Sequence, residues 1–284
     1  MTTHIKILIL NWNGKHLLKP CLDSVTAIDY PNYSVMVIDN GSVDDSVKMV
    51  NEDFPEVDII ELKDNYGFSG GYNRCFTQLR DEYSELVLLL NNDTEVDPNI
   101  LSSFIQAKDK YGDNHLYGGK IFYKNNPEKI WYAGGDVNLK YAKISHRGIR
   151  QNDSEEFSKP LKTDYVTGCC LFTSMEVINQ LNGFDERFNM YGEDVDLCLR
   201  AHKMGISCYY YPEAKLWHKV SASMGGQFSI AKWKRKHKGK MILVAKHSEP
   251  YKIPVSLLLA MLVSIIEFIY LVLIKFQFII KSKK

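Results

Sequence analysis

Short apolar runs alternate with segments of helical spacing over the first part of the chain. Apolar runs of five or six residues predict buried strands, and the amphipathic segments between them predict helices. Strands that alternate with helices predict an α/β fold with a Rossmann-like, mostly parallel central sheet flanked by helices. The predicted strands are 5–10, 33–38, 57–62 and 86–90, and the predicted helices are 15–26, 44–52 and 72–83.

Beyond residue 114 the pattern becomes less regular. Trp131, Tyr132 and the pair Gly134-Gly135 indicate irregular or antiparallel structure, and the polar stretch 147–162 predicts a loop. Earlier in the chain, the glycines of 67–71 predict a loop whose backbone can approach a ligand closely. The later predicted elements are a strand over 165–173, a helix over 175–181, a helix over 192–204 that Gly205 ends, and a strand over 208–211 before Pro212.

The C-terminal part combines a basic stretch with a long apolar run. Residues 232–246 read KWKRKHKGKMILVAK, and residues 255–274 are apolar apart from Glu267 and two serines. About 20 apolar residues are long enough to cross a bilayer, and one acid at its centre costs roughly 3 kcal/mol. Lysines at both ends fit a membrane-associated helix better than the alternative, a buried C-terminal helix. The pattern is compatible with a helix that spans the bilayer and with one that lies in its interface.

Composition and charge narrow the class of protein. The 284 residues are 45% hydrophobic and carry a net charge of +1, so we expect a real core and no nucleic-acid partner. The six cysteines form no CxxC pair, which favours a reducing compartment over a disulfide framework or a zinc ribbon. The apolar run near Ile5 is too short for a signal peptide.

Polar residues follow the ends of several predicted strands, at Asn11, Asp39, Asn65 and Asp93. In open parallel sheets, ligands bind beyond the carboxyl ends of the strands. Separate loops are therefore expected to bring these side chains to one crevice.

Asp93 ends the segment Asn91-Asn92-Asp93 after the fourth predicted strand. A carboxylate in this place can hold Mg²⁺ or Mn²⁺ against a phosphate, and the two amides can bind ribose. The alternative is a polar turn.

Asp39 likewise has two interpretations, because its carboxylate could accept the imide N–H of uracil or thymine, or could form an Asx turn in Asp-Asn-Gly-Ser.

A second acidic cluster, Glu193-Asp194-Val195-Asp196, lies far along the chain. Acids at a helix start are favoured by the helix dipole by ~0.3–1 kcal/mol each, and Asp196 has the i,i+4 spacing to Arg200 of a surface pair. Three acids in four residues exceed what capping requires, so a general base is the competing hypothesis. His218 could join Asp93 at a metal, although spacing alone does not select it.

Five segments carry a more specific pattern: LILNWNG, VIDNGSVDDS, NYGFSGGYN, LLLNNDTEVDP and GFDERFNMYGEDVDLCLRAHKMG, followed by Trp217-His218. In this order they resemble family 2 glycosyltransferases with a GT-A fold, and within that family the rhamnosyltransferase-like branch. The resemblance covers about residues 4–240. It is specific for the family and leaves the sugar open.

The resemblance implies a metal-dependent, inverting transfer of a sugar, with rhamnose as one candidate, from a dTDP- or UDP-linked donor to an acceptor hydroxyl. Asp194 would be the catalytic base, and Glu193 would orient the acceptor or the base. Mn²⁺ or Mg²⁺ would be held by Asp93, the last acid of the DXD element, and by His218. The implied nucleotide-binding residues are Asn11, Asp39, Asn73, Asn91, Asn92 and Asp93.

The chain departs from the family pattern in two places. Asn91 stands where many relatives carry aspartate, which weakens the ribose and metal contacts implied there. Residues 232–237 stand where relatives often carry an aromatic-arginine-asparagine element, and the match is too partial to imply a role.

Together these patterns predict a GT-A domain over 1–230, with a nucleotide-binding half over 1–112 and an acceptor-binding half over 113–230, and a basic, membrane-associated segment over 231–284. The enzyme would act at the cytoplasmic face of the cell membrane, on a glycan or lipid-linked saccharide in cell-surface polysaccharide or glycolipid synthesis. A homo-oligomer is compatible with this sequence. The other hypotheses are a catalytically inactive nucleotide-sugar-binding protein at the membrane, a membrane-anchored interaction protein, and a nucleotidyltransferase, for which no glycine-rich, lysine-containing loop follows the first strand.

Overall fold

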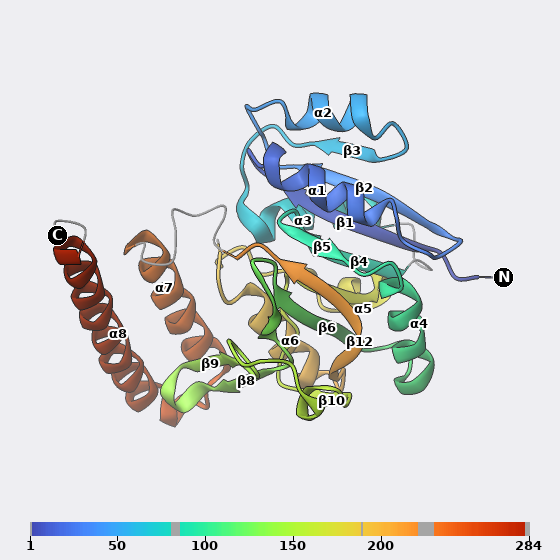
Figure 1. Cartoon of the computed structure of the whole chain (residues 1–284). Coiled ribbons are helices and arrows are strands. Elements are labelled where there is room, and N and C mark those ends of the chain that lie inside the picture. Colours follow the sequence, from blue (N-terminus) through green and yellow to red (C-terminus); the bar gives the residue numbers. More distant parts are fainter. Residues whose placement is uncertain (1, 81–85, 189, 221–229, 282–284) are drawn as a thin grey trace.

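A ten-stranded sheet runs through the centre of the computed structural model, which describes residues 2–80, 86–188, 190–220 and 230–281 (Figure 1). The strand order is β10-β12-β6-β11-β4-β1-β2-β3, with β5 beside β12 and β7 beside β6. One hydrophobic cluster draws side chains from the strands and from the helices packed on them.

The N-terminal half is the predicted parallel α/β unit. Its four strands pair in parallel. The apolar runs of β1 and β4 are buried in the core, whereas β2 is partly buried and β3, at the sheet edge, is half-buried or exposed. Short crossover helices connect them, as the alternating pattern requires. The strands are β1 (Ile5–Asn11), β2 (Tyr33–Asp39), β3 (Asp58–Glu61) and β4 (Leu86–Asn91), and the helices are α1 (Lys15–Val25), α2 (Ser46–Asp53) and α3 (Gly67–Gln78).

The predicted glycine-rich loop over 67–71 is wrong, because α3 already begins at Gly67. The Asn40 side chain fixes this start: its Oδ1 accepts the Tyr66 N–H at 3.0 Å, and its Nδ2 donates to the Gly67 carbonyl at 3.0 Å. A Cβ at Gly71 would lie 2.5 Å from Leu10 Cδ1. Glycine at position 71 therefore allows α3 to pack closely on β1, and it does not mark a flexible loop.

The second half is mixed, because β11 runs antiparallel to both β4 and β6 while β12 runs parallel to β6. The antiparallel structure expected after residue 114 is present as β6–β7 and as the separate hairpin β8–β9. The elements are β5 (Thr94–Val96), α4 (Ile100–Tyr111), β6 (Leu116–Tyr123), β7 (Asn126–Tyr132), β8 (Gly135–Asn138), η1 (Leu139–Tyr141), β9 (Lys143–His146), η2 (Glu155–Phe157), β10 (Leu161–Thr163), β11 (Cys170–Ser174), α5 (Met175–Gln180), α6 (Glu193–Lys203) and β12 (Cys208–His218).

Two strand predictions need correction. The strand predicted over 165–173 begins only at Cys170, which leaves the backbone just before it outside the ladder. The strand predicted to stop before Pro212 continues to His218. A register shift between Tyr211 and Lys215 accommodates the proline, as expected where proline occurs inside a sheet.

The C-terminal helices α7 (Ile230–His247) and α8 (Ile253–Lys281) lie beside the sheet domain and pack on each other, with the short η3 (Pro250–Lys252) between them (Figure 1). Trp233 Nε1 donates to the Ser264 carbonyl at 3.2 Å, and His237 Nδ1 lies 2.6 Å from Ser264 Oγ. Polar contacts thus join one face of α8 to α7.

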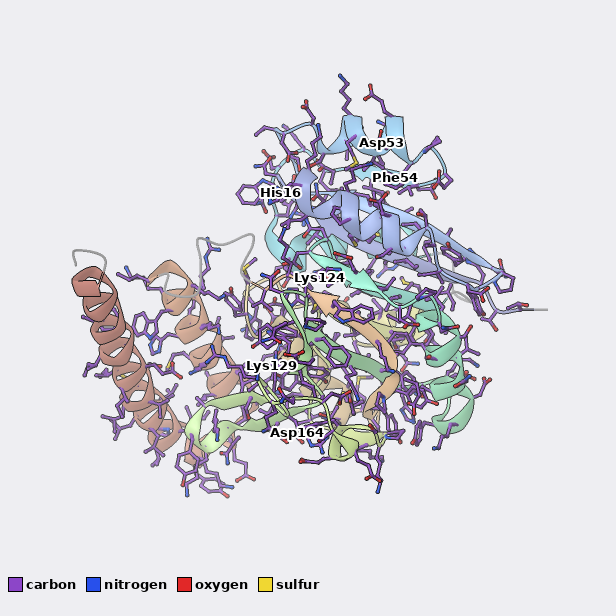
Figure 2. All side chains as sticks on the ribbon, viewed as in Figure 1. His16, Asp53, Phe54, Lys124, Lys129 and Asp164 are labelled. Carbon is purple, nitrogen blue, oxygen red and sulfur yellow. The ribbon has the colours of Figure 1, made fainter. Side chains whose placement is uncertain are left out.

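The other face of α8 is apolar and open, and its side chains project away from the protein (Figure 2). Over the described residues, the segment Pro250–Ile269 is long and apolar enough to cross a membrane, with a mean hydropathy of 2.1. Only a small part of this segment is buried inside the protein. The alternative of a buried C-terminal helix is therefore wrong. The exposed apolar side chains are Val255, Leu258, Met261, Leu262, Ile265, Ile266, Ile269 and Val272.

Candidate active site

The carboxyl ends of β1, β2 and β4 bring three predicted side chains together. Asn11 Nδ2 lies 3.3 Å from Asp39 Oδ1, and Asn11 Oδ1 accepts a hydrogen bond from Asn92 Nδ2 at 2.7 Å. Parallel pairing sets this arrangement, because Asn11 lies opposite Asp39 in the register of β1 and β2. Asn11 and Asp39 are almost completely buried, so the surrounding protein holds both side chains in place.

Two small residues that the sequence analysis did not single out support this group. Ser42 donates its N–H to Asp39 Oδ2 at 2.9 Å, which is the Asx turn, and its hydroxyl accepts the Asn13 N–H at 2.9 Å. The turn holds Asp39 Oδ2, and the longer hydrogen bond from Asn11 Nδ2, at 3.3 Å, reaches Oδ1. Gly14 leaves room for the amide pair, because a Cβ there would lie 2.4 Å from Asn92 Nδ2.

Asp93 and His218 form the second part of the site. Antiparallel pairing of β5 with β12 places His218 opposite Thr94, and His218 Nε2 lies 3.1 Å from Asp93 Oδ1. Both side chains are buried. The Trp131 ring packs edge-on against the imidazole, with 4.5 Å between centroids, and so limits its rotation.

The donor atoms of this pair fit a hard divalent cation. Asp93 Oδ1 is buried and makes no hydrogen bond among the residues that the structure describes, although it faces His218 Nε2 at 3.1 Å, so a cation between these two atoms would have one oxygen and one nitrogen ligand. Buried polar atoms seldom remain unsatisfied unless a water or ion completes them. Across the same described residues, no group of three His, Cys, Asp or Glu side chains is arranged to hold a metal ion. The protein would therefore supply two ligands, and the substrate and water would supply the others.

Asp194 lies in the first turn of α6 and is oriented by backbone donors. Its Oδ2 accepts the Gly168 N–H at 3.0 Å, and its Oδ1 accepts the Val195 N–H at 2.8 Å. Burial raises the pKa of Asp194, partly opposed by the hydrogen bonds from Gly168 and Val195. A carboxylate that is held in place and has increased basicity is suited to remove a proton.

Glu193 differs from Asp194 in its protonation. Burial, followed by the nearby charge of Asp194, raises the pKa of Glu193 well above its ordinary value. Its Oε2 is buried and has no hydrogen-bond partner among the described residues. Glu193 therefore holds a proton more readily than Asp194, and the two acids can have different roles.

The start of β11 joins the two acidic clusters. Gly168 binds Asp194, and the carbonyl of the next residue, Cys169, accepts the Asn91 N–H at 3.1 Å. Burial raises the pKa of the Cys169 thiol, and the charges of Asp93 and Asp194 add to this effect. The segment Gly168-Cys169 thus contacts a residue of each acidic cluster, Asp194 and Asn91.

Two predicted nucleotide-site residues have other contacts. Asn73 binds the Phe184 backbone through both polar atoms, at 2.8 and 2.9 Å, and its Nδ2 lies 3.1 Å from Glu186 Oε1. The structure uses Asn73 to hold this loop and does not bring it into the group around Asn11. Asn91 supports β4 through its backbone, and its carbonyl accepts the Thr94 hydroxyl at 2.7 Å.

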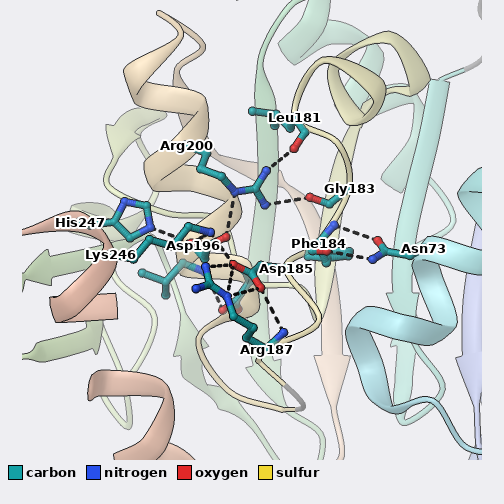
Figure 3. Close-up of polar contacts among 12 residues, drawn as sticks. Asn73, Leu181, Gly183, Phe184, Asp185, Arg187, Asp196, Arg200, Lys246 and His247 are labelled. Atoms are coloured by element: carbon teal, nitrogen blue, oxygen red, sulfur yellow. Dashed lines mark hydrogen bonds and ion pairs between the residues drawn. The ribbon is translucent and has the colours of Figure 1, made fainter. Parts of the chain in front are cut away.

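Asp196 is fully buried, so its interpretation as part of a surface pair with Arg200 is wrong. Asp196 binds Arg200, Lys246 and His247 at 2.7–2.8 Å (Figure 3). Burial alone would raise the pKa of Asp196, but hydrogen bonds from His247, Lys246 and Arg200 lower it. The cluster fastens the end of α7 to the helix that begins with Glu193 and Asp194. No local sequence pattern connects these segments.

Comparisons with known proteins agree with this architecture. The family model for glycosyl transferase family 2 matches residues 6–181, and a model described as the N-terminal domain of galactosyltransferase matches residues 149–220. An N-acetylglucosaminyl-diphospho-decaprenol L-rhamnosyltransferase of Mycobacterium tuberculosis is 25% identical over 275 residues, which cover 89% of this chain and 88% of that protein. Rhamnosyltransferase WbbL of Escherichia coli is 24% identical over 222 residues, or 73% of this chain and 80% of WbbL.

Two solved structures share the fold. GalNAc-T7 with UDP, GalNAc and Mn²⁺ superposes with a TM-score of 0.66 at 14% identity, over 85% of this chain and 48% of GalNAc-T7. The mannosyltransferase PcManGT of Pyrobaculum calidifontis, in complex with GDP-Man and Mn²⁺, gives 0.60 at 17% identity, over 91% of this chain and 70% of PcManGT. The predicted GT-A fold is confirmed. Because the family model also covers more than half of the sequence, the chain belongs to glycosyltransferase family 2 and resembles its rhamnosyltransferases.

Proposed function

We propose that this glycosyltransferase transfers a sugar, with inversion, from a dTDP- or UDP-linked donor to a hydroxyl of a glycan or lipid-linked saccharide. The observation that carries the proposal is the connection through Gly168 and Cys169, which links the Asp194 carboxylate to the backbone of Asn91, two residues before Asp93. A transferase needs the group that binds the donor and the group that removes the acceptor proton to lie next to each other.

Asp194 acts as the general base. It takes the proton from the acceptor hydroxyl while that oxygen forms a bond to the anomeric carbon. The bond from this carbon to the diphosphate oxygen breaks on the opposite face, and its electrons leave with the nucleotide diphosphate. The Gly168 and Val195 N–H groups hold the Asp194 carboxylate in position during this transfer.

Glu193 orients the acceptor or the base. Its raised pKa keeps the carboxyl protonated beside the Asp194 carboxylate. A protonated acid can donate a hydrogen bond, whereas a carboxylate would repel its neighbour.

Asn11, Asp39, Asn92 and the adjoining Asn91 bind the nucleotide, with the Asp39 carboxylate accepting the N–H of the pyrimidine. Asp93 and His218 would hold Mn²⁺ or Mg²⁺, and the approach of His218 Nε2 to the buried Asp93 Oδ1 at 3.1 Å, with no hydrogen bond to that oxygen, supports this assignment. When bound, the ion supplies positive charge for the leaving diphosphate. Asn73 acts indirectly, by positioning the loop at Phe184.

Rhamnose heads the candidate donor sugars because two relatives are named as rhamnosyltransferases. The open apolar face of α8 supports membrane association and a lipid-linked acceptor. We place the reaction in cell-surface polysaccharide or glycolipid synthesis at the cytoplasmic face of the membrane. Residues 1–112 then form the nucleotide-binding half, 113–230 the acceptor-binding half and 231–284 the membrane-associated segment.

A nucleotide-release assay over a donor panel tests the reaction. The panel begins with dTDP-rhamnose and includes UDP-galactose, UDP-glucose and UDP-N-acetylglucosamine. Asp194→Asn preserves shape but removes the base, so we expect transfer to fall by about 10²- to 10⁴-fold with nucleotide affinity nearly unchanged. Retained turnover in Asp194→Asn would remove this residue from its role. Nucleotide-sugar binding by the wild type without turnover of any donor would favour an inactive binding protein.

Calorimetry tests the metal assignment separately. Asp93→Ala removes the charged ligand, so nucleotide binding should lose its dependence on added Mn²⁺. The wild type, titrated with and without Mn²⁺, provides the reference. An equal response to Mn²⁺ in Asp93→Ala would contradict the assignment.

A further inference from the structure

The open apolar side chains of α8 occupy one side of the helix only. They run from Val255 to Val272 with the spacing of a single helical face. The opposite side turns toward the protein, where Ser256, Ala260 and Ser264 are buried at intervals of four residues. α8 therefore has two different sides, although its composition alone would suit a helix surrounded by lipid.

The buried side of α8 is attached to polar groups of α7 near the middle of the apolar run 255–274. The Ser264 carbonyl accepts the Trp233 indole N–H at 3.2 Å, and the Ser264 hydroxyl lies 2.6 Å from His237 Nδ1. Three residues further along, Glu267 forms an ion pair with Lys240 at 2.7 Å. These contacts fix which side of α8 faces the protein.

Apolar contacts hold the first half of α8 on the same side. Ala260 packs in a small buried cluster with Val244 of α7 and with Ala142 at the end of η1. Both α7 and η1 therefore contact α8, and α7 lies between α8 and the sheet domain (Figure 1). If α8 entered the hydrocarbon layer along its full length in this arrangement, α7 would enter with it.

The charge of α7 argues against such an entry. Between Ile230 and His247 it carries six lysines and one arginine and no Asp or Glu, and Lys234, Arg235 and Lys238 are exposed. A lysine or arginine is costly at the centre of a bilayer. A transmembrane α8 would place residues 233–240 at the depth of Ser264, near the middle of the span. The observed packing is thus compatible with a helix that lies in the plane of the membrane surface, and not with one that crosses it.

Basic residues stand beside the apolar face at the height expected of lipid headgroups. Packed helices are about 8–10 Å apart, so Lys234 and Lys238 of α7 lie about one helix spacing above α8. Lys140 of η1 and Lys143 of β9 are exposed as well. Two acids of this region are already paired with lysines, in Glu267–Lys240 and Glu249–Lys252. An apolar helix face with a layer of cations beside it matches an anionic membrane surface.

We propose that α8 docks in the plane of an anionic lipid surface, with its apolar side in the outer acyl region and α7 at the level of the headgroups. This inference rests on the membrane association in the proposed function and specifies its orientation. Both ends of α8 then lie on the same side of the membrane as the sheet domain. Because the Tyr191 carbonyl touches α7 at Gly239, the docked helix also fixes how far Glu193 and Asp194 lie from the headgroups.

Cysteine labelling in membrane vesicles from expressing cells tests this orientation. The six native cysteines are buried, so a membrane-impermeant maleimide reports on an introduced cysteine. Lys281→Cys stands at the last residue of α8, and Lys48→Cys marks the exposed side of α2 in the sheet domain. We expect both variants to be labelled in inverted vesicles and neither in right-side-out vesicles. Labelling of Lys281→Cys only in right-side-out vesicles would show a helix that crosses the membrane and would overturn the proposal.

Co-sedimentation of the purified full chain with vesicles tests the two parts of the surface. We compare vesicles of phosphatidylcholine with vesicles of phosphatidylcholine and phosphatidylglycerol in equal parts. Ile266→Ser should weaken binding to both by about tenfold. Lys234→Gln/Lys238→Gln should weaken binding only to the anionic vesicles, by about fivefold for each lysine. The matched control is Met204→Ser, because this side chain is also exposed, 55% against 66% for Ile266, but lies outside α8.

The contrary results are distinct. Equal weakening by Met204→Ser and Ile266→Ser would show unspecific adsorption of apolar side chains and would overturn the proposal. A wild type that sediments with neither kind of vesicle, and forms a dimer that Ile266→Ser abolishes, would assign the apolar side of α8 to a second copy of the chain. Nucleotide release is measured in detergent without a membrane, so failure of this orientation and failure of the proposed transferase activity can be told apart.

Discussion

Gly239→Ala is expected to destabilise the protein although it replaces glycine by the best helix former. Inside an unconstrained helix this change stabilises by about 1 kcal/mol. Here the new Cβ would lie 2.2 Å from the Tyr191 carbonyl oxygen and 3.2 Å from its carbon. These neighbours are backbone, so rotation of a side chain cannot relieve the overlap.

The magnitude follows from two opposing terms. Overpacking of a well-packed region costs typically ~1–3 kcal/mol, against a gain of about 1 kcal/mol in helix propensity. The expected net loss is about 1 kcal/mol, or a decrease of roughly 2–4 °C in Tm for a domain of this size. Because Tyr191 and Gly192 both adopt positive φ values, 77° and 104°, the loop has little freedom to move without displacing Glu193 and Asp194.

Thermal unfolding and nucleotide release, measured on the same samples, check this prediction. We expect a lower Tm together with a larger fractional loss of transfer rate than of nucleotide affinity, because α7 contacts the loop before the proposed catalytic acids Glu193 and Asp194. Lys238→Ala is the matched control, since it adds alanine to an exposed position of the same helix. A rise in Tm for Gly239→Ala would refute the close approach of Tyr191 to α7.

Two further substitutions test the buried charges of α6. Glu193 has a raised pKa in the folded protein, so its contribution to stability is present below its ordinary pKa of 4.5 and decreases as pH rises through the folded value. The Tm of the non-titrating Glu193→Gln should therefore rise relative to that of the wild type as the pH increases above about 5, and a difference that stays constant with pH would contradict the raised pKa of Glu193. Asp196→Ala leaves Arg200, Lys246 and His247 without their shared carboxylate, and the free energy of unfolding, from denaturant titration, should fall by about 3–5 kcal/mol. A loss below about 1 kcal/mol, as for an exposed pair, would refute the role of this cluster in fastening α7.

The elements that sequence patterns predicted well are those whose burial is continuous. The strand 86–90 is apolar at every position and becomes β4, with all five residues buried. The prediction for 67–71 failed because the local pattern shows only flexible glycines. Gly71 is required by a residue far away in the sequence, because a methyl group of Leu10 occupies the space that a side chain at position 71 would need.

For the candidate site, the sequence identified most acids but not their supports. Asp93 and Asp194 are recognisable from strand-end and helix-start positions and from the family motifs. Trp131, which packs against His218, and Gly168, which donates its N–H to Asp194, lie in segments without a recognisable motif. Asn73 belongs to a family motif, yet its hydrogen bonds hold the backbone at Phe184, a use that depends on where that loop lies.

The sequence by itself determined the alternation of strands and helices, the polar residues after the strands, and the apolar C-terminal run, because each follows from local periodicity and composition. Tertiary structure alone decided that Gly168 and Cys169 connect the two acidic clusters, that Asp196 is buried beneath α7, and that Lys236 of α7 lies over the Tyr191 ring. These contacts join residues far apart along the chain. Their energies depend on burial and distance, which no local pattern encodes.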